Sequence, residues 1–272
     1  MEILYSILRE AGEAGEDRAH LAAMVGPPSL ARDVDDPGED NAFGDCLSLG
    51  QEMGLLVATG DNVRLTEPAG PRSFLEIARR QMVDDVQTAE PVTGWVAGAI
   101  AWMLSQDPRN PLPWSGSNAS NRLQAQMGSL PYGMTNDSRF QQAVYWARAL
   151  GFVTRLNLKQ EVVISDPTEA VQQRLDAVIP PGHEMTLVAF TASLGRICPV
   201  FDGGSVWREV SGHINAKSQD RVVSLSLALA LHRLKQRGAL EFSYLDDAQS
   251  IYVQGLLGDG QVSHVSRPRG HA

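Results

Sequence analysis

Polar and basic side chains of the types that contact nucleic acids gather in two regions of the chain. Asn, Gln and Arg can form paired hydrogen bonds with base edges, and Arg and Lys neutralise phosphates. The first group lies on two consecutive predicted helices and the hairpin after them: Asn118, Asn121, Arg122, Arg139, Gln142, Tyr145, Arg148, Arg155 and Lys159. The second lies where a long helix is predicted to begin: Lys217, Ser218, Gln219 and Arg221. We take both groups as DNA-binding candidates. The alternative is that they are polar helix faces that contact only water.

Other chemistries find little support in the residues. The chain has none of the short motifs of phosphate-binding loops, serine hydrolases or zinc peptidases. Its six histidines are scattered, and His183-Glu184 follows a Pro-Pro-Gly segment that predicts a loop. The acidic run 33–40 lacks ligands that a calcium loop requires, and Asp202-Gly203-Gly204 is interpreted as a turn with Ser205 capping the next helix. We therefore expect no catalytic residue, no metal site and no cofactor.

A pattern of helix, glycine and hairpin occurs three times along the chain. Each predicted helix ends at a glycine that can adopt the left-handed conformation: Gly54, Gly151 or Gly238. An apolar pair or triplet follows at once, then a polar turn and a second apolar strand. The second strands are Val63-Arg64-Leu65, Val162-Val163-Ile164 and Ile251-Tyr252-Val253. Two short strands around a polar turn predict a hairpin, with residues 59–62 at the tip in the first copy.

Two further helices are predicted before each glycine-terminated helix. They lie at about 2–12 and 16–24 in the first copy, at 92–104 and 118–127 in the second, and at 185–196 and 205–213 in the third. Apolar residues at helical spacing mark 92–104, and 118–127 is a shorter polar helix. The resulting order, helix, helix, helix, strand, strand, is typical of a winged helix-turn-helix domain. We predict a mainly α fold with small β-hairpins, of the α+β class, built from three such tandem units joined by linker helices. The alternative is an α+β protein in which three similar hairpins occur by chance.

The predicted units divide a chain of 272 residues, which is long enough for two or three small cores. Residues 1–70 form an acidic winged-helix unit, residues 71–180 a linker helix with the second unit, and residues 181–256 the third unit. Residues 257–272 are predicted to form a disordered, mildly basic tail.

The net charge of −9 is distributed unevenly over these units. Residues 1–70 contain four basic and 14 acidic residues, residues 71–180 ten of each, and residues 181–272 nine basic and eight acidic. The third helix of the first unit has acidic residues and no basic one, so DNA phosphates would repel it. We expect the first unit to dock a protein partner, and the other two units to contact duplex DNA.

The cellular location follows from features that the sequence lacks. Cys46 and Cys198 are too few for a disulfide framework and have no metal-ligand spacing. The N-terminal segment has no signal-peptide pattern, and the longest apolar stretch, 92–104, is shorter than the about 20 residues that span a bilayer. We expect a cytoplasmic protein that does not contact a membrane.

Two segments, together with the glycine-terminated helices, resemble one protein family. WVAGAIAWMLSQDP (Trp95–Pro108) and ICPVFDGG (Ile197–Gly204) are similar to the DpdG-type proteins, which are encoded in bacterial clusters that modify or restrict DNA bearing 7-deazaguanine. The resemblance implies a non-catalytic partner in an anti-phage defence complex. It supplies no functional residue for this chain.

Three functions are compatible with the sequence. The first is a winged-helix adaptor of a DNA-processing or defence complex, which the uneven charge favours. The second is a DNA-binding transcriptional regulator, which requires dimeric symmetry and a basic recognition surface. The third is an enzyme of unknown type, which would require a pocket with clustered carboxylates or histidines whose pKa values are strongly shifted.

Overall fold

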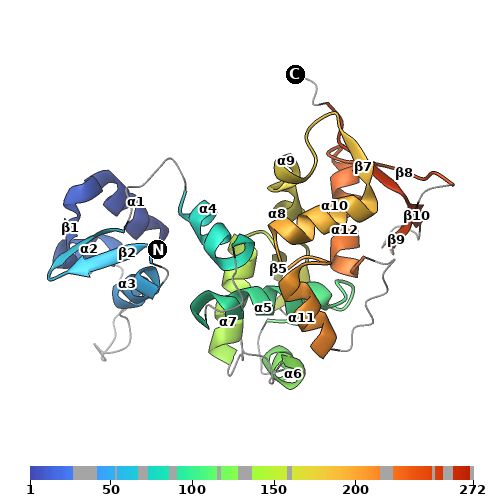
Figure 1. The fold of residues 1–272 in the computed structure, drawn as a ribbon. Helices are drawn as coiled ribbons and strands as arrows, with labels where there is room; N and C mark the ends of the chain where they lie inside the picture. Colours follow the sequence, from blue (N-terminus) through green and yellow to red (C-terminus); the bar gives the residue numbers. More distant parts are fainter. Residues whose placement is uncertain are drawn as a thin grey trace. The chain divides into compact units, whose positions relative to one another are not determined.

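The structure of the protein is a computed structural model that forms two compact units, 1–81 and 82–272 (Figure 1). It describes residues 1–26, 42–52, 54–66, 73–85, 91–114, 118–127, 137–157, 161–214, 223–246, 249–253 and 260–269. Within these residues the chain is mainly helical with small antiparallel sheets, which confirms the predicted α+β class. None of the helices described is both long and apolar enough to cross a bilayer.

The first unit contains helix, strand, helix, helix, strand, strand in that order, which we call the first repeat. Its sheet has the strand order β1-β3-β2, with antiparallel neighbours. The bounds are α1 Glu2–Ala11, the 3₁₀ turn η1 Gly12–Ala14, β1 Glu16–Asp17, α2 Arg18–Val25, α3 Ala42–Glu52, β2 Leu56–Thr59 and β3 Asn62–Leu65. Helix α4 (Phe74–Arg79) and the π-helical turn η3 (Arg80–Asp84) follow. The predicted helices and hairpin are present, and β1 is an element that the sequence pattern did not predict.

Local chemistry sets the element boundaries of this unit. The Asp17 carboxylate caps α2 by accepting two backbone N–H groups of the first turn, at 2.9 and 3.0 Å. Gly54 has a φ of 66° after α3, as predicted for a helix stop, and Gly60 has a φ of 61° in the two-residue turn between β2 and β3. Ser73 and Glu76 form a capping box at the start of α4.

The second unit opens with the same order of elements, which we call the second repeat. Its sheet has the order β4-β6-β5, so the short strand between the first two helices again pairs with the last strand. The bounds are α5 Pro91–Ser105, β4 Leu112–Pro113, α6 Asn118–Met127, α7 Asp137–Ala149, β5 Val153–Asn157 and β6 Glu161–Ser165. Gly151, between α7 and β5, has a φ of 81° and ends the helix as predicted.

The rest of the second unit contains three longer helices and two small sheets. The bounds are α8 Thr168–Gln172, α9 Leu175–Val178, β7 Glu184–Thr186, α10 Leu187–Ile197, α11 Ser205–His213, α12 Leu225–Gln236, β8 Glu241–Ser243, β9 Ile251–Val253, β10 Gly260–Val262 and β11 His264–Ser266. The sheets have the orders β7-β11-β8 and β10-β9. Helices α10 and α11 lie close to their predicted ranges.

Helix α5 forms the core of the second unit. Residues 96–104 are all buried, as expected for a helix that is apolar on every side. The Ser165 hydroxyl donates to the Met103 carbonyl and the Ser226 hydroxyl donates to the Leu104 carbonyl, each at 2.5 Å. One turn of α5 therefore anchors both the end of β6 and the start of α12.

The C-terminal strands differ from the prediction. β8 pairs with β11 and not with β9, and β11 also pairs with β7, so the predicted third hairpin is wrong. The predicted disorder is wrong for residues 260–266, which form β10 and β11. Val265 lies opposite Met185 and Phe242 and is fully buried. Burial of this apolar side chain favours the addition of β11 to the sheet.

Helix α12 begins at Leu225, so the prediction that it begins at Lys217 is wrong. Ser224 is the N-cap, and its hydroxyl oxygen accepts a hydrogen bond from the first turn at 3.2 Å. Asp202 fixes this cap, since its carboxylate accepts from the Ser224 backbone N–H at 2.6 Å and from the Ser224 hydroxyl at 2.8 Å. Burial raises the pKa of Asp202, and the bonds from Ser224 oppose that shift.

Arg174 is a buried cation that joins distant parts of the second unit. Its side chain is 3% exposed and donates to Asp84 at 2.6 and 3.0 Å and to the Ala170 carbonyl at 2.7 Å. Its guanidinium carbon lies 5.4 Å from the ring centroid of Phe152 and 6.0 Å from that of Phe201. The charge is therefore compensated by a carboxylate, a carbonyl and two aromatic faces.

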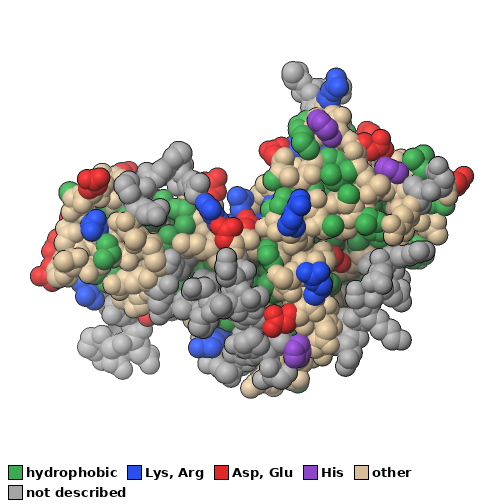
Figure 2. Space-filling view, in the orientation of Figure 1, with side chains coloured by type: hydrophobic (Ala, Val, Ile, Leu, Met, Phe, Trp, Pro, Cys, Tyr) green, Lys and Arg blue, Asp and Glu red, His purple; other side chains and the backbone are tan. Residues whose placement is uncertain are grey.

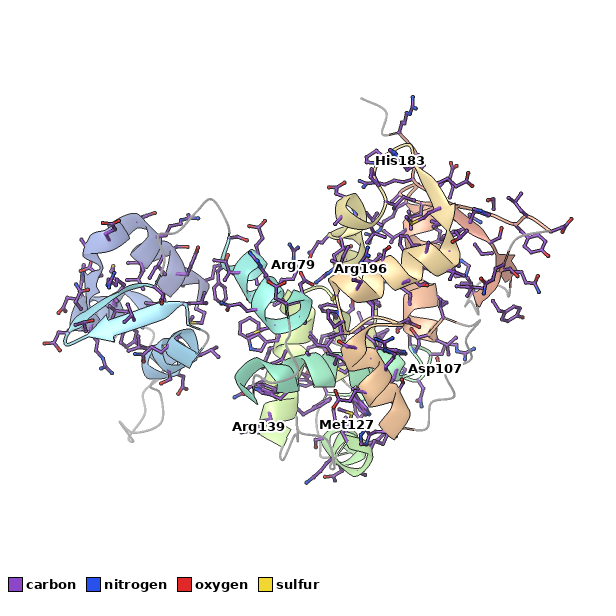
Figure 3. All side chains as sticks on the ribbon, viewed as in Figure 1. Arg79, Asp107, Met127, Arg139, His183 and Arg196 are labelled. Carbon is purple, nitrogen blue, oxygen red and sulfur yellow. The ribbon has the colours of Figure 1, made fainter. Side chains whose placement is uncertain are left out.

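Replacing Arg174 by alanine should lower the free energy of unfolding by about 3–5 kcal/mol, because Asp84 loses its cationic partner inside the protein. Urea unfolding followed by circular dichroism measures this change. The matched control is Arg196→Ala, at an exposed position near the end of α10 (Figure 3), which should change stability by no more than about 0.5 kcal/mol. Equal losses in the two variants would contradict the assignment.

The two cysteines should differ in reactivity. Burial raises the pKa of Cys198 to about 12, whereas Cys46 is half-buried. Because the thiolate is the reactive form, Ellman's reagent at about pH 8 should label Cys46 in the folded protein and Cys198 only after unfolding. Thiol counts in buffer and in denaturant measure this difference, and Cys46→Ser should abolish the native reaction. Fast native labelling of Cys198 would overturn this prediction.

Candidate nucleic-acid interface

Helix α6 presents a polar face to solvent. Ala119, Leu123 and Met127 are buried at helical spacing, which leaves Asn121 and Arg122 exposed on the other side. Asn118 is the first residue of the helix, and its side chain lies outside the described residues. The candidates Asn121 and Arg122 are therefore accessible, and their contact with DNA stays a prediction.

Helix α7 carries four candidates along one exposed stripe. Arg139 (Figure 3), Gln142, Tyr145 and Arg148 follow each other at intervals of three residues and are all exposed, with Tyr145 55% exposed. Residues three apart are neighbours on a helix surface, so these side chains form a continuous row, which turns by about 60° at each step and places Arg139 and Arg148 at opposite edges of the exposed side. The opposite side of the helix is buried by Phe140, Ala143, Val144 and Ala147. Burial of one side of α7 thus fixes which residues face outward.

Arg155 is held in place on the hairpin that follows α7. Its guanidinium donates to Glu161 on the paired strand at 2.6 Å, and its guanidinium carbon lies 4.1 Å from the centroid of the Trp114 ring. The Tyr145 ring packs edge to face against Trp114, with 5.2 Å between the two ring centroids. Arg155 is therefore a positioned cation whose charge Glu161 partly compensates. Trp114 directly follows β4. The sequence pattern predicted neither the strand β4 nor a role for Trp114 beside Arg155.

A pocket of about 380 Å³ lies beside this hairpin. Four arginines and two carboxylates line it together with smaller residues, and we call these six the arginine pocket: Arg148, Arg155, Arg233, Arg237, Asp166 and Glu169. Two of these arginines were candidates from the sequence, on α7 and β5. The other two, Arg233 and Arg237, lie at the C-terminal end of α12, where the helix dipole also favours cations.

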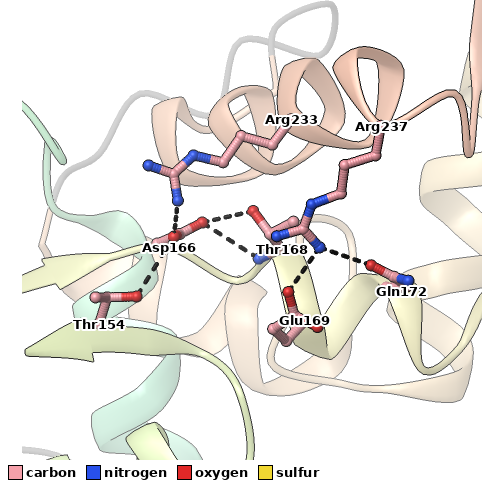
Figure 4. Close-up of polar contacts among 7 residues, drawn as sticks. All are labelled: Thr154, Asp166, Thr168, Glu169, Gln172, Arg233 and Arg237. Carbon is pink, nitrogen blue, oxygen red and sulfur yellow. Dashed lines mark hydrogen bonds and ion pairs between the residues drawn. The ribbon is translucent and has the colours of Figure 1, made fainter.

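Polar contacts cross the floor of the arginine pocket between α12 and the β6–α8 corner (Figure 4). Arg233 donates to Asp166, which also accepts from the Thr168 hydroxyl at 2.6 Å. Arg237 donates to Glu169 at 2.6 Å and to Gln172 at 2.7 Å. These two arginines therefore do more than complement a helix dipole, because they join α12 to the second repeat. Their spacing of four residues on one helix face is the signal that the sequence offered.

The other candidates are not brought together. Lys159, Lys217, Ser218, Gln219 and Arg221 lie outside the described residues. Asp202, in the predicted Asp-Gly-Gly turn, accepts hydrogen bonds from Ser224. Gly204 is the N-cap of α11, so the prediction that Ser205 caps this helix is wrong. Among the described residues, no three His, Cys, Asp or Glu side chains are placed to hold a metal ion.

The first unit has a different electrostatic character. Its helices α2 and α3 contain Arg18 against Asp45 and Glu52, whereas α6 and α7 contain three arginines against Asp137 alone. Figure 2 shows acidic side chains, in red, along the left edge of this unit. Large apolar side chains are also exposed on it, at Ile3, Met24 and Leu75. Such a surface suits a protein partner better than a polyanion.

Comparisons with known proteins give one match. A sequence model of a family described as DpdG-like matches residues 1–248. No curated protein and no solved structure matches the chain.

Glu161→Gln should tighten the binding of duplex DNA about fivefold, because it releases Arg155 and removes a negative charge 2.6 Å from that guanidinium. Fluorescence anisotropy of a labelled duplex at low salt measures the effect. Asp107→Asn is the matched control, since it removes the carboxylate of a similar pair with Arg109 away from the hairpin strands. An equal gain in both variants would exclude a role for Arg155.

Proposed function

This chain belongs to the DpdG-like family, and we propose that it is an accessory, non-catalytic component of a multi-protein bacterial system that processes DNA in defence against phage. In this proposal the second repeat binds duplex DNA and the first unit binds a protein partner.

The proposed architecture is that of tandem winged helices. The order helix, strand, helix, helix, strand, strand, with the first strand paired to the last, occurs in both repeats and supports this interpretation. We infer a third, modified unit in α10, α11 and α12 with the sheet β7-β11-β8. There the extra strand precedes the first helix instead of following it.

The observation that carries the DNA-binding proposal is the exposed stripe of α7. In a winged helix the third helix enters the major groove, and α7 is the third helix of the second repeat. Its outward residues include a glutamine, which can pair with base edges, two arginines, whose charges can neutralise phosphates, and a tyrosine. The arginine of the following hairpin, Arg155, would lie beside a phosphate. The only acidic residue in the sequences of α6 and α7 is Asp137, at the start of α7.

The partner proposed for the first unit is a protein with a basic surface. Ile3 is 60% exposed and lies on a unit with an excess of acidic residues. An exposed apolar side chain on an acidic unit fits a partner that presents an apolar contact on a surface rich in Lys or Arg. This arrangement leaves the second unit available for DNA.

The double variant Arg139→Ala/Arg148→Ala should weaken duplex binding and reduce the steepness of its salt dependence by about two, since each phosphate contact contributes about 0.9 to the slope of log K against log salt. The matched control, Arg18→Ala/Arg64→Ala, removes two exposed arginines of the first repeat and should leave both quantities unchanged. Anisotropy over a series of salt concentrations measures them.

Two results would overturn the proposed function. One is the absence of duplex binding at low salt in the unmodified protein. The other is a failure of the full-length protein to co-purify with the products of neighbouring genes.

A further inference from the structure

The arginine pocket concentrates positive charge where two separate parts of the second unit meet. Arg148 comes from the last turn of α7, Arg155 from β5, and Arg233 and Arg237 from the end of α12. Two carboxylates, Asp166 and Glu169, lie in the same lining, and Glu161 pairs with Arg155 from outside it, so four positive charges meet three negative ones. The excess of positive charge favours an anion in the pocket.

Most hydrogen-bond donors of these arginines remain available. A guanidinium has five N–H donors. Arg233 uses one on Asp166, Arg155 uses one on Glu161, and one nitrogen of Arg237 serves both of its acceptors. Arg148 forms no hydrogen bond or ion pair with any part of the chain that the structure describes. A multiply charged anion with several acceptor oxygens would satisfy donors that the protein leaves unused.

The two carboxylates of the pocket have different roles. The Asp166 side chain is 7% exposed and is fixed by Thr168 and Arg233, so it orients one arginine permanently. The Glu169 side chain is 57% exposed and pairs with Arg237, which is 45% exposed. Exposed pairs of this kind contribute little to stability. An incoming anion can therefore displace Glu169 without disturbing the fold.

We propose that the arginine pocket binds the phosphate of a nucleotide, either free or within a DNA strand. Arginine forks match the oxygens of phosphate in paired hydrogen bonds, and several in one pocket give both charge and geometry. The volume of about 380 Å³ exceeds that of a bare phosphate and leaves room for part of the attached sugar. The DNA-strand form of this inference rests on the proposed function, and the free-nucleotide form is independent of it.

The test uses the full-length protein with inorganic phosphate and with ATP as probes, against sodium chloride at matched ionic strength. A ligand that binds only the folded state stabilises it by RT ln(1 + L/Kd), where L is the free ligand concentration, and so raises the melting temperature as that concentration increases. Phosphate and ATP should stabilise the protein more than chloride does. Arg237→Gln should weaken the effect about tenfold in apparent affinity, since one charged donor group is lost. Glu169→Gln should strengthen it, because the competing carboxylate is removed.

Two further variants keep the result interpretable. Arg109→Gln, in an exposed ion pair formed by other residues, should behave like the unmodified protein. Arg233→Gln should also weaken the stabilisation by phosphate and ATP. Because Arg233→Gln leaves the buried Asp166 without its cation, this variant can fail to fold, and in that case Arg237→Gln alone is the test. Equal stabilisation by phosphate in the unmodified protein and in Arg237→Gln would contradict the proposal that the arginine pocket binds phosphate.

Duplex binding separates the two sources of phosphate. If Arg237→Gln weakens duplex binding, the pocket holds a phosphate of DNA. If it weakens the ATP effect alone, the pocket holds a free nucleotide, which remains possible even when the duplex does not bind and the proposed function fails. Duplex binding that depends on Arg139 and not on Arg237, with no specific effect of phosphate or ATP, would leave the proposed function standing and overturn the pocket.

Discussion

The burial of α5 is the constraint on which the second unit depends. A helix that is apolar on every side is stable only when other elements cover it, and α7, α11 and α12 all contact α5. The carbonyls of Met103 and Leu104 accept hydroxyl groups from Ser165 and Ser226, at the end of β6 and the start of α12. These contacts bring the second hairpin and α12 to the same place, and the arginine pocket lies between them.

The polar interactions of this unit are built on that apolar core. Arg174 is enclosed by Asp84, the Ala170 carbonyl and two aromatic rings. Removing one partner of such a buried ion pair leaves an uncompensated charge and destabilises the fold. The pair therefore holds Asp84 and Arg174, which are far apart in the sequence, next to each other. Arg233 and Arg237 act nearer to the surface and leave donors unused. Arg174 holds the core together, whereas Arg233 and Arg237 join α12 to the second repeat and still have unused N–H donors.

Charge divides the chain into regions of different electrostatic character. The excess of acid is confined to residues 1–70, while α6 and α7 are basic and polar on their outward sides. Because a local surface and not the total charge meets a ligand, a protein of net charge −9 can still bind DNA through one face. The net charge argues only against nucleic-acid binding through bulk electrostatics, and the division by unit shows that residues 71–272 carry no excess of acid.

The sequence by itself determined the elements whose signals are local. Apolar spacing placed α5, and Gly54, Gly151 and Gly238 end helices with positive φ because glycine has no Cβ. Strands β1 and β4 are two residues long, too short to show any alternation, so only pairing reveals them. β11 likewise depends on Met185, which is remote in sequence. The arginine pocket was decided by tertiary structure alone, because Arg233 meets Asp166 across 67 residues and no local pattern records that distance.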